Sequence, residues 1–221
     1  MRRLRLTGVP ERDAERSAES GSQVELVAVI ILSITTVLTA WSGFQSSKWG
    51  GEMSIAFSEA SAARIEAARQ QGTANERTAA HVGLWTQWVN ARGEQNAELA
   101  QFLESRFPEP LATAQQDWLA TDPLSNEDGS SPFDMPSYVL PEKAAAADAD
   151  ARADQRFADA LTNNQRGDNY TLLTVLFAAV LFFTAMSQRM RNTRSQRLLL
   201  GLAIALGLAG IGLGISFPTT F

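Results

Sequence analysis

Hydrophobic positions gather in three long runs along the chain, at residues 24–44, 170–187 and 198–217. The only charged residue among them is Glu25, at the edge of the first run. A helix rises about 1.5 Å per residue and the hydrocarbon core of a bilayer is about 30 Å thick, so about 20 apolar residues cross it. A core helix of a soluble protein would keep a polar stripe, and the second and third runs are apolar all round. The pattern therefore predicts three transmembrane helices.

The region between the first two runs, residues 45–169, is polar and rich in Ala, Glu, Gln and Arg, which are good helix formers. It shows no clear strand pattern and no solenoid repeat. Pro stops helices and Gly weakens them, so these residues divide the region into segments. We expect an antiparallel bundle in which the first span runs on without a break into a helix at residues 45–71, and Gly72-Thr73 either ends or bends this helix. A second helix is expected at 74–106, a short one at 111–120 and an irregular loop at 121–141. A third helix, 141–161, is expected to continue into the second span, and the segment from Asn163 to Asp168 is where a break would fall.

Small side chains recur at alternating spacings of four and three residues in the first of these segments. This spacing is that of the a and d positions of a coiled coil, and small residues there allow two helices to approach closely. The predicted packing positions are Trp49, Met53, Ala56, Ala60, Ala63 and Ala67.

Glycines give the third apolar run a second predicted packing face. Gly210 and Gly214 form a small-x-x-x-small pair, and Ala203 with Gly207 forms another. Such pairs let helices approach within a membrane. The sequence leaves open whether Gly207, Gly210 and Gly214 contact another helix of the same chain or a second copy.

Arginine residues predict the orientation in the membrane. Residues 1–23 carry five Arg and residues 188–197 carry four, and short positive segments prefer the cytoplasm. We therefore expect a disordered cytoplasmic tail at 1–23, a cytoplasmic loop at 188–197, and extracytoplasmic segments at 45–169 and 218–221. The predicted class is an all-α membrane protein with an extracytoplasmic helical bundle between spans one and two.

The first run also resembles a signal peptide. Its apolar part is longer than the usual core of about 7–15 residues, and Leu38-Thr39-Ala40 is a poor cleavage site. A retained anchor is the favoured interpretation. Arg2, Arg3 and Arg5 either touch anionic lipid headgroups or only set the topology.

The composition of the chain excludes or argues against several kinds of site and partner. The chain has no Cys and a single His, so disulfides and a site built from several histidines are excluded. Residues 45–169 carry 19 Asp and Glu against 10 Lys and Arg, which argues against nucleic acid as a partner.

Candidate catalytic and metal-binding residues each have a simpler interpretation. His81 lacks an obvious catalytic partner and is expected at an ordinary surface or interface. The calcium-loop-like segment 126–129 would need carboxylates where Leu124 and Met135 stand. A solvated helix face is the favoured interpretation of the acidic positions Asp148, Asp150, Asp154 and Asp159. We predict no catalytic, cofactor or metal site, and thus no enzyme.

Hydroxyl residues are the main polar groups inside the predicted spans. No ionisable residue lies at mid-membrane, although ion-coupled transporters usually place one there. The hydroxyls either bond carbonyls of their own helix or line a passive pore. They are Ser33, Thr35, Thr36, Thr39, Thr174 and Thr184.

The segment Trp41-Ser42-Gly43-Phe44-Gln45, followed by Lys48-Trp49 and by Ala60-Ser61-Ala62 with Arg64, resembles the opening of an uncharacterised family of bacterial three-span membrane proteins. In that family a Trp/Gln-rich turn ends the first span, an Ala-rich helix follows, and two spans close the chain. The resemblance covers the whole layout and implies a bacterial inner-membrane location. It implies no activity.

Two functions remain open at this point. The first is a non-enzymatic membrane protein whose outer bundle binds another membrane protein or assembles with copies of itself in the cell envelope. The second is a small homo-oligomeric channel or transporter component, which the hydroxyls of the first span and the acidic outer domain favour.

Overall fold

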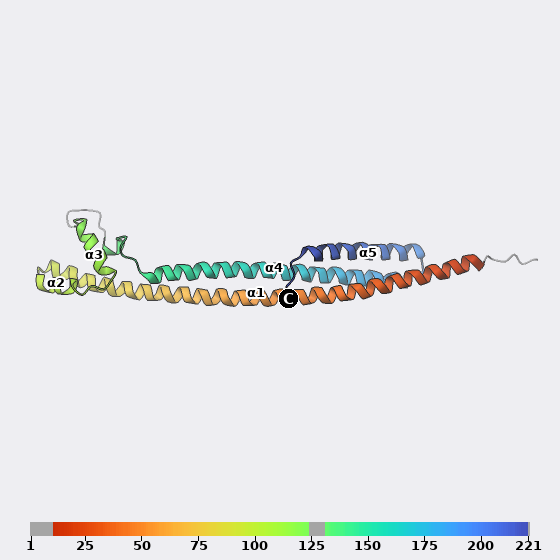
Figure 1. Cartoon of the computed structure of the whole chain (residues 1–221), viewed down its shortest axis with the longest axis horizontal. Coiled ribbons are helices and arrows are strands. Elements are labelled where there is room, and N and C mark those ends of the chain that lie inside the picture. Colours follow the sequence, from red (N-terminus) through yellow and green to blue (C-terminus); the bar gives the residue numbers. More distant parts are fainter. Residues whose placement is uncertain (1–10, 124–130, 221) are drawn as a thin grey trace, which may run out of the picture. The chain divides into compact units, whose positions relative to one another are not determined.

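The computed structural model describes residues 11–123 and 131–220, with side chains from residue 23 onward. This part of the chain is helical and contains no strand (Figure 1). Three of its helices, α1, α4 and α5, are long and apolar enough to cross a membrane, as predicted. The elements are α1 (Glu11–Gly93), α2 (Ala97–Glu104), α3 (Leu111–Ala120), the 3₁₀ turn η1 (Pro132–Asp134), α4 (Pro141–Arg189) and α5 (Thr193–Ser216).

Two compact units make up the fold. Met1–Ile55 and Asp159–Phe221 form the first, called here the three-helix unit, and Ala56–Ala158 form the second, called the hairpin unit. Helices α1 and α4 contribute residues to both units. The three apolar runs lie in the first unit, whereas the second holds most of the polar region.

Of the two outcomes predicted at Gly72-Thr73, the end of the helix is wrong, because α1 continues without interruption to Gly93. A single Gly inside a helix costs about 1 kcal/mol relative to Ala, and the Pro-free neighbouring segments are strong enough helix formers to outweigh it. The chain turns instead at residues 94–96, where Gln95 adopts a φ of 61°. Asn96 then caps α2 by accepting a hydrogen bond from the Leu99 backbone N–H.

The predicted continuation of the last outer helix into the second span is confirmed, since α4 is continuous from Pro141 to Arg189, and no break occurs between Asn163 and Asp168. Gly167 is buried against α1, where an added Cβ would lie 3.5 Å from the Ser46 carbonyl oxygen and 3.6 Å from the Trp49 Cβ. This glycine therefore permits a close helix approach and does not end a helix. The start of a helix at Pro141 and the short helix at Leu111–Ala120 are confirmed.

The flanking segments are more ordered than expected. Of the tail predicted to be disordered, residues 1–10 lie outside the described residues, while α1 begins at Glu11, in a segment rich in Glu, Arg and Ala. The loop predicted at 188–197 is reduced to three residues, 190–192. Asn192 ends it by capping α5 through the Arg194 backbone N–H.

Within the three-helix unit, α4 runs antiparallel to both α1 and α5. Ser46 hydrogen-bonds Thr171, and Leu38 packs against the cluster that contains Phe177. An earlier residue of α1 therefore contacts a later residue of α4, as in an antiparallel pair. Buried positions in this unit recur every seven residues, as in a coiled coil. They include Ala28, Thr35, Ser42 and Trp49 in α1 and Leu173, Val180 and Ser187 in α4.

The hairpin unit joins residues 56–93 of α1 to residues 141–158 of α4. Three ion-paired contacts fix the antiparallel register between the two helices. Buried alanines separate these contacts and form the seam between the helices. The pairs are Glu59 with Arg156, Arg64 with Asp150 and Asp154, and Arg77 with Glu142.

Candidate functional site

The far end of the hairpin unit carries an aromatic cluster, called here the head. It comprises the last turns of α1, the helices α2 and α3, and the chain from η1 to Pro141. The turn at residues 94–96 folds α2 back, so that Ala100 of α2 joins Ala91 of α1 in one core. The buried core residues are Trp88, Ala91, Ala100, Phe107, Leu111 and Trp118.

Edge-to-face ring contacts hold the head together. The centroid of the Trp85 ring lies 5.8 Å from the ring centroids of both Trp118 and Phe133, and the Trp88 and Trp118 centroids are 6.4 Å apart. Phe133 continues the series to Tyr138 at 5.0 Å. Such pairs contribute about 0.5–1.5 kcal/mol each beyond the area they bury, so this series of rings fixes α3 and η1 against α1.

An open pocket of about 380 Å³ lies between the end of α1 and the end of α3. Trp88 and Trp118 form its walls, and both are more than nine-tenths buried. Val89 and Leu119 line its rim and remain 39% and 37% exposed. The pocket thus combines a rigid aromatic interior with an apolar rim.

The guanidinium group of Arg92 also lines this pocket. The Arg92 Cζ lies 5.7 Å from the centroid of the Trp88 ring, while the Trp88 Nε1 donates to Glu104 at 3.3 Å. No carboxylate of the described residues approaches Arg92 within salt-bridge distance. Arg92 therefore lines the pocket and has no acidic partner inside this part of the chain.

Polar groups line the inner side of the head. The His81 Nδ1 lies 2.9 Å from the Tyr138 hydroxyl, and His81 is 3% exposed, so it is an interface residue between α1 and the segment that precedes α4. The Trp85 Nε1 donates to the buried Gln115 Oε1 at 3.0 Å. Burial, together with the charge of Arg77, lowers the pKa of His81. This histidine is therefore neutral at pH 7.

The predicted seam residues lie along α1 facing α4. Trp49, Ala56 and Ala60 are buried, whereas Ala63 and Ala67 are half-buried. In the three-helix unit, the Arg166 guanidinium lies 4.6 Å from the centroid of the Trp49 ring. These side chains pack helices and form no reactive site.

The predicted glycines of α5 face α4 of the same chain. A Cβ added at Gly210 would lie 2.7 Å from the Phe177 Cε1, and one at Gly214 would lie 3.5 Å from Leu173 Cδ1. At Gly207 the nearest atom is Val180 Cγ1, at 3.8 Å. The sequence left open whether these glycines contact the same chain or a second copy, and the structure shows that they contact α4 of the same chain.

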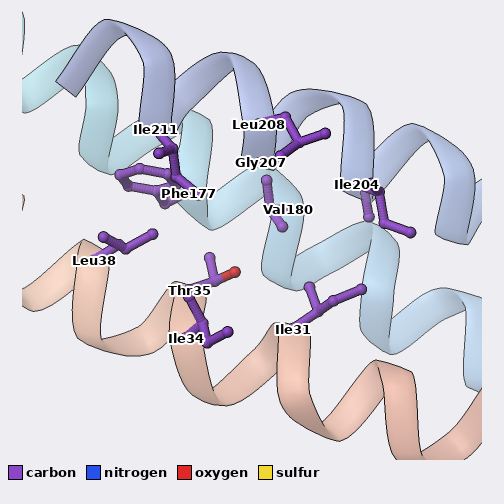
Figure 2. Close-up of a pocket in the computed structure, with 11 residues that line it drawn as sticks. Ile31, Ile34, Thr35, Leu38, Phe177, Val180, Ile204, Gly207, Leu208 and Ile211 are labelled. Atoms are coloured by element: carbon purple, nitrogen blue, oxygen red, sulfur yellow. The ribbon is translucent and has the colours of Figure 1, made fainter. Parts of the chain in front are cut away.

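A second cavity, of about 130 Å³, lies inside the three-helix unit, where side chains from all three helices converge (Figure 2). Its lining is apolar except for the Thr35 hydroxyl, and it borders a space of about 370 Å³ that shares Leu38, Phe177 and Ile211. Tyr170, Ser42 and Thr219 also line the larger space, and the Tyr170 hydroxyl donates a hydrogen bond to the Pro218 carbonyl oxygen at 3.2 Å. No Asp, Glu, Lys, Arg or His is among the residues that line either space.

Five of the six hydroxyls singled out in the spans bond carbonyls of their own helices, whereas Thr35 lines the cavity inside the three-helix unit. Ser33, Thr36 and Thr39 each donate to the carbonyl four residues earlier, and so do Thr174 and Thr184. Of the two interpretations of these hydroxyls, the structure therefore favours the intrahelical one.

The acidic residues of α4 do not form a cation site. Asp150 and Asp154 accept hydrogen bonds from Arg64 across the hairpin. No group of three or more His, Cys, Asp or Glu side chains that could hold a metal occurs in the part of the chain that the structure describes. The segment 126–129 lies outside that part.

Sequence reasoning missed the pocket and the roles of Arg92, Trp118 and Leu119 in it. The available signal was the gathering of Trp85, Trp88, Trp118 and Tyr138 in an otherwise polar, Ala-rich region. Their meeting depends on the turn at residues 94–96, which sequence reasoning placed inside a helix.

Comparison with family models, curated proteins and solved structures finds no match to this chain. The resemblance to a three-span family thus stays a prediction, and the function rests on the geometry alone.

Proposed function

We propose that this chain is a non-enzymatic, three-span protein of the bacterial inner membrane whose hairpin unit lies outside the cytoplasm and binds a partner protein through the head. The observation that carries the proposal is the open pocket between Trp88 and Trp118, with Val89 and Leu119 exposed at its rim. Apolar residues exposed around a pocket are typical of interaction sites, and Trp and Arg are enriched among the residues that dominate binding energy.

Orientation in this proposal rests on the arginines. The segments 1–23 and 188–197 carry the Arg residues that favour the cytoplasmic side. If the three apolar helices each cross the membrane, residues 45–169 lie on the opposite side in this proposal, which the lengths and composition of these helices support.

Partner binding is better supported than self-assembly. The prediction of assembly relied on Gly207, Gly210 and Gly214, which pack on α4 of the same chain. The channel interpretation is also less well supported, because Ser33, Thr36 and Thr39 of the first span donate to carbonyls of their own helix.

A photo-crosslinking residue placed at Val89 in living cells tests the proposal. We expect a discrete adduct with a second protein, which is lost when Trp88→Ala is added to the same chain. A crosslinker at Ala151, exposed on α4 away from the pocket, serves as the matched control.

The mass of the adduct separates the alternatives. An adduct of twice the chain's mass would indicate self-assembly, whereas another mass indicates a different partner. If Val89 yields no more adduct than Ala151, the head is not a binding surface.

A further inference from the structure

We propose that the pocket between Trp88 and Trp118 receives an apolar side chain of the partner polypeptide and that Arg92 binds a carboxylate next to that side chain. This inference rests on the proposed function of the head and specifies the chemistry of its partner. The carboxylate belongs either to the C-terminus of the partner or to an adjacent Asp or Glu.

The pocket walls select for an apolar group. The Trp88 and Trp118 rings contact each other edge to face and pack against the buried core of the head, so their positions are fixed before a ligand arrives. The volume of about 380 Å³ lies at the small end of the range of ligand pockets, about 300–1,000 Å³. A preformed aromatic slot of this size suits one side chain and its neighbouring backbone.

Arg92 supplies the polar selectivity. Its guanidinium lies over the Trp88 ring at the pocket, with no acidic partner among the described residues. Arginine binds a carboxylate through two parallel N–H donors, which fixes direction as well as charge. A ligand that fills the pocket and ends in a carboxylate therefore satisfies both features of the site.

The charge of the surrounding region sharpens this selectivity. Residues 45–169 carry an excess of acidic side chains, so an anion gains little from the general field of the domain. Only a carboxylate that reaches Arg92 itself is stabilised, and the apolar contact must supply most of the affinity.

A polypeptide fits the rim better than a small organic acid does. Val89 and Leu119 stand on the two sides of the opening and are each more than one-third exposed. A small ligand confined to the pocket would leave both in water, whereas a polypeptide would cover them. Contacts of this kind exclude water around a central anchor at protein interfaces.

Three synthetic peptides test the chemistry on the full chain in detergent micelles, with tryptophan fluorescence as the readout. The probes are N-acetyl-Gly-Gly-Phe with a free carboxylate, the same peptide as its amide, and N-acetyl-Gly-Phe-Asp-Gly-amide. We expect at least one carboxylate peptide to bind about ten times more tightly than the simple amide, since a charge-assisted hydrogen bond contributes about that factor. Preference for the first probe indicates a C-terminal carboxylate, and preference for the third indicates an acidic side chain.

Arg92→Gln should remove this tenfold preference, whereas Arg106→Gln should leave it intact. Arg106 is the matched control because it lies in the same head, over the Phe102 ring and away from the pocket. Carboxylate peptides that bind no better than the amide, or an equal loss in both variants, would overturn the inference.

Two substitutions of opposite charge at one rim residue, Leu119, provide a test in which Arg92 itself is unchanged. Leu119→Lys should strengthen binding of the carboxylate peptide and Leu119→Glu should weaken it, because both changes replace an exposed side chain and spare the core. Equal effects of the two substitutions would contradict the assignment. Should the peptides fail while the Val89 crosslink persists, the head still binds a partner and only the carboxylate chemistry is wrong.

Discussion

At the scale of single residues, the glycines of α5 lie on two faces of the helix. Gly210 abuts Phe177 of α4, whereas Gly212 has no atom within 4 Å of an added Cβ. The two positions therefore predict opposite effects of the same added methyl group.

Gly210→Ala should lower the free energy of unfolding by about 1–3 kcal/mol, because its Cβ would lie 2.7 Å from an aromatic carbon that cannot easily move. Gly212→Ala should be neutral or should stabilise by up to about 1 kcal/mol through better helix propensity. Thermal unfolding in detergent micelles measures both. Equal shifts would show that α5 does not pack on α4 through Gly210.

His81 predicts a pH dependence of stability. Burial and the charge of Arg77 lower the pKa of His81 in the folded chain. At a pH below the ordinary histidine pKa of about 6.5, the unfolded chain therefore binds more protons than the folded chain does. The stability contributed by neutral His81 is therefore complete above that value and is lost as the pH falls below it.

The melting temperature of the hairpin unit within the full chain should thus fall between pH 7.5 and pH 5. His81→Gln should reduce this fall, and the chain has no other histidine that titrates in the window. An unchanged pH profile in the variant would assign the effect to other groups.

At the scale of elements, the alanine seam determines how closely α1 and α4 approach in the hairpin unit. Ala60 is 5% exposed and lies in register between the Phe57–Phe157 ring contact and the Arg64 ion pairs. Ala62, two residues away, is exposed.

Ala60→Glu should destabilise the hairpin unit by about 2–4 kcal/mol, because it forces a charge into a buried, close-packed position. Ala62→Glu should change stability by less than about 0.5 kcal/mol, as surface substitutions usually do. Chemical denaturation followed by circular dichroism compares the two. Similar losses would remove the seam assignment.

The sequence predicted the long apolar helices, the short helix α3 and the start of α4 at Pro141, because each has a strong local signal. It also predicted that the first span continues into an outer helix and that the last outer helix continues into the second span. It failed where it allowed a helix end at Gly72 and placed residues 94–96 inside a helix, because a weak local breaker lies inside α1 while the chain turns at Gln95. At Gly167 the same residue type has the opposite role, since the missing Cβ admits the α1 backbone.

The pocket could not be predicted because its walls are distant in sequence. Trp88 and Arg92 are neighbours on α1, but Trp118 and Leu119 reach them only after the chain turns at Gln95 and again before α3. A sequence pattern shows which aromatic residues are present, whereas the turns decide which of them meet.

At the scale of the whole molecule, the proposed function assigns membrane anchoring and partner binding to different units of the chain. The three-helix unit supplies the apolar helices, and its two cavities have mostly apolar linings. The head of the hairpin unit holds the aromatic pocket, lined also by Arg92, which has no acidic partner among the described residues. Partner binding outside the cytoplasm requires that these two parts of the chain lie on the sides that the arginines predict.

Labelling of single cysteines in intact cells tests that requirement most directly, because the chain has no cysteine of its own. Leu119→Cys places a thiol at the exposed rim of the pocket, and Arg194→Cys places one at the exposed start of α5. A maleimide that cannot cross the membrane should modify Leu119→Cys in intact cells and Arg194→Cys only after the cells are lysed. Modification of Arg194→Cys in intact cells, with Leu119→Cys protected until lysis, would contradict the account.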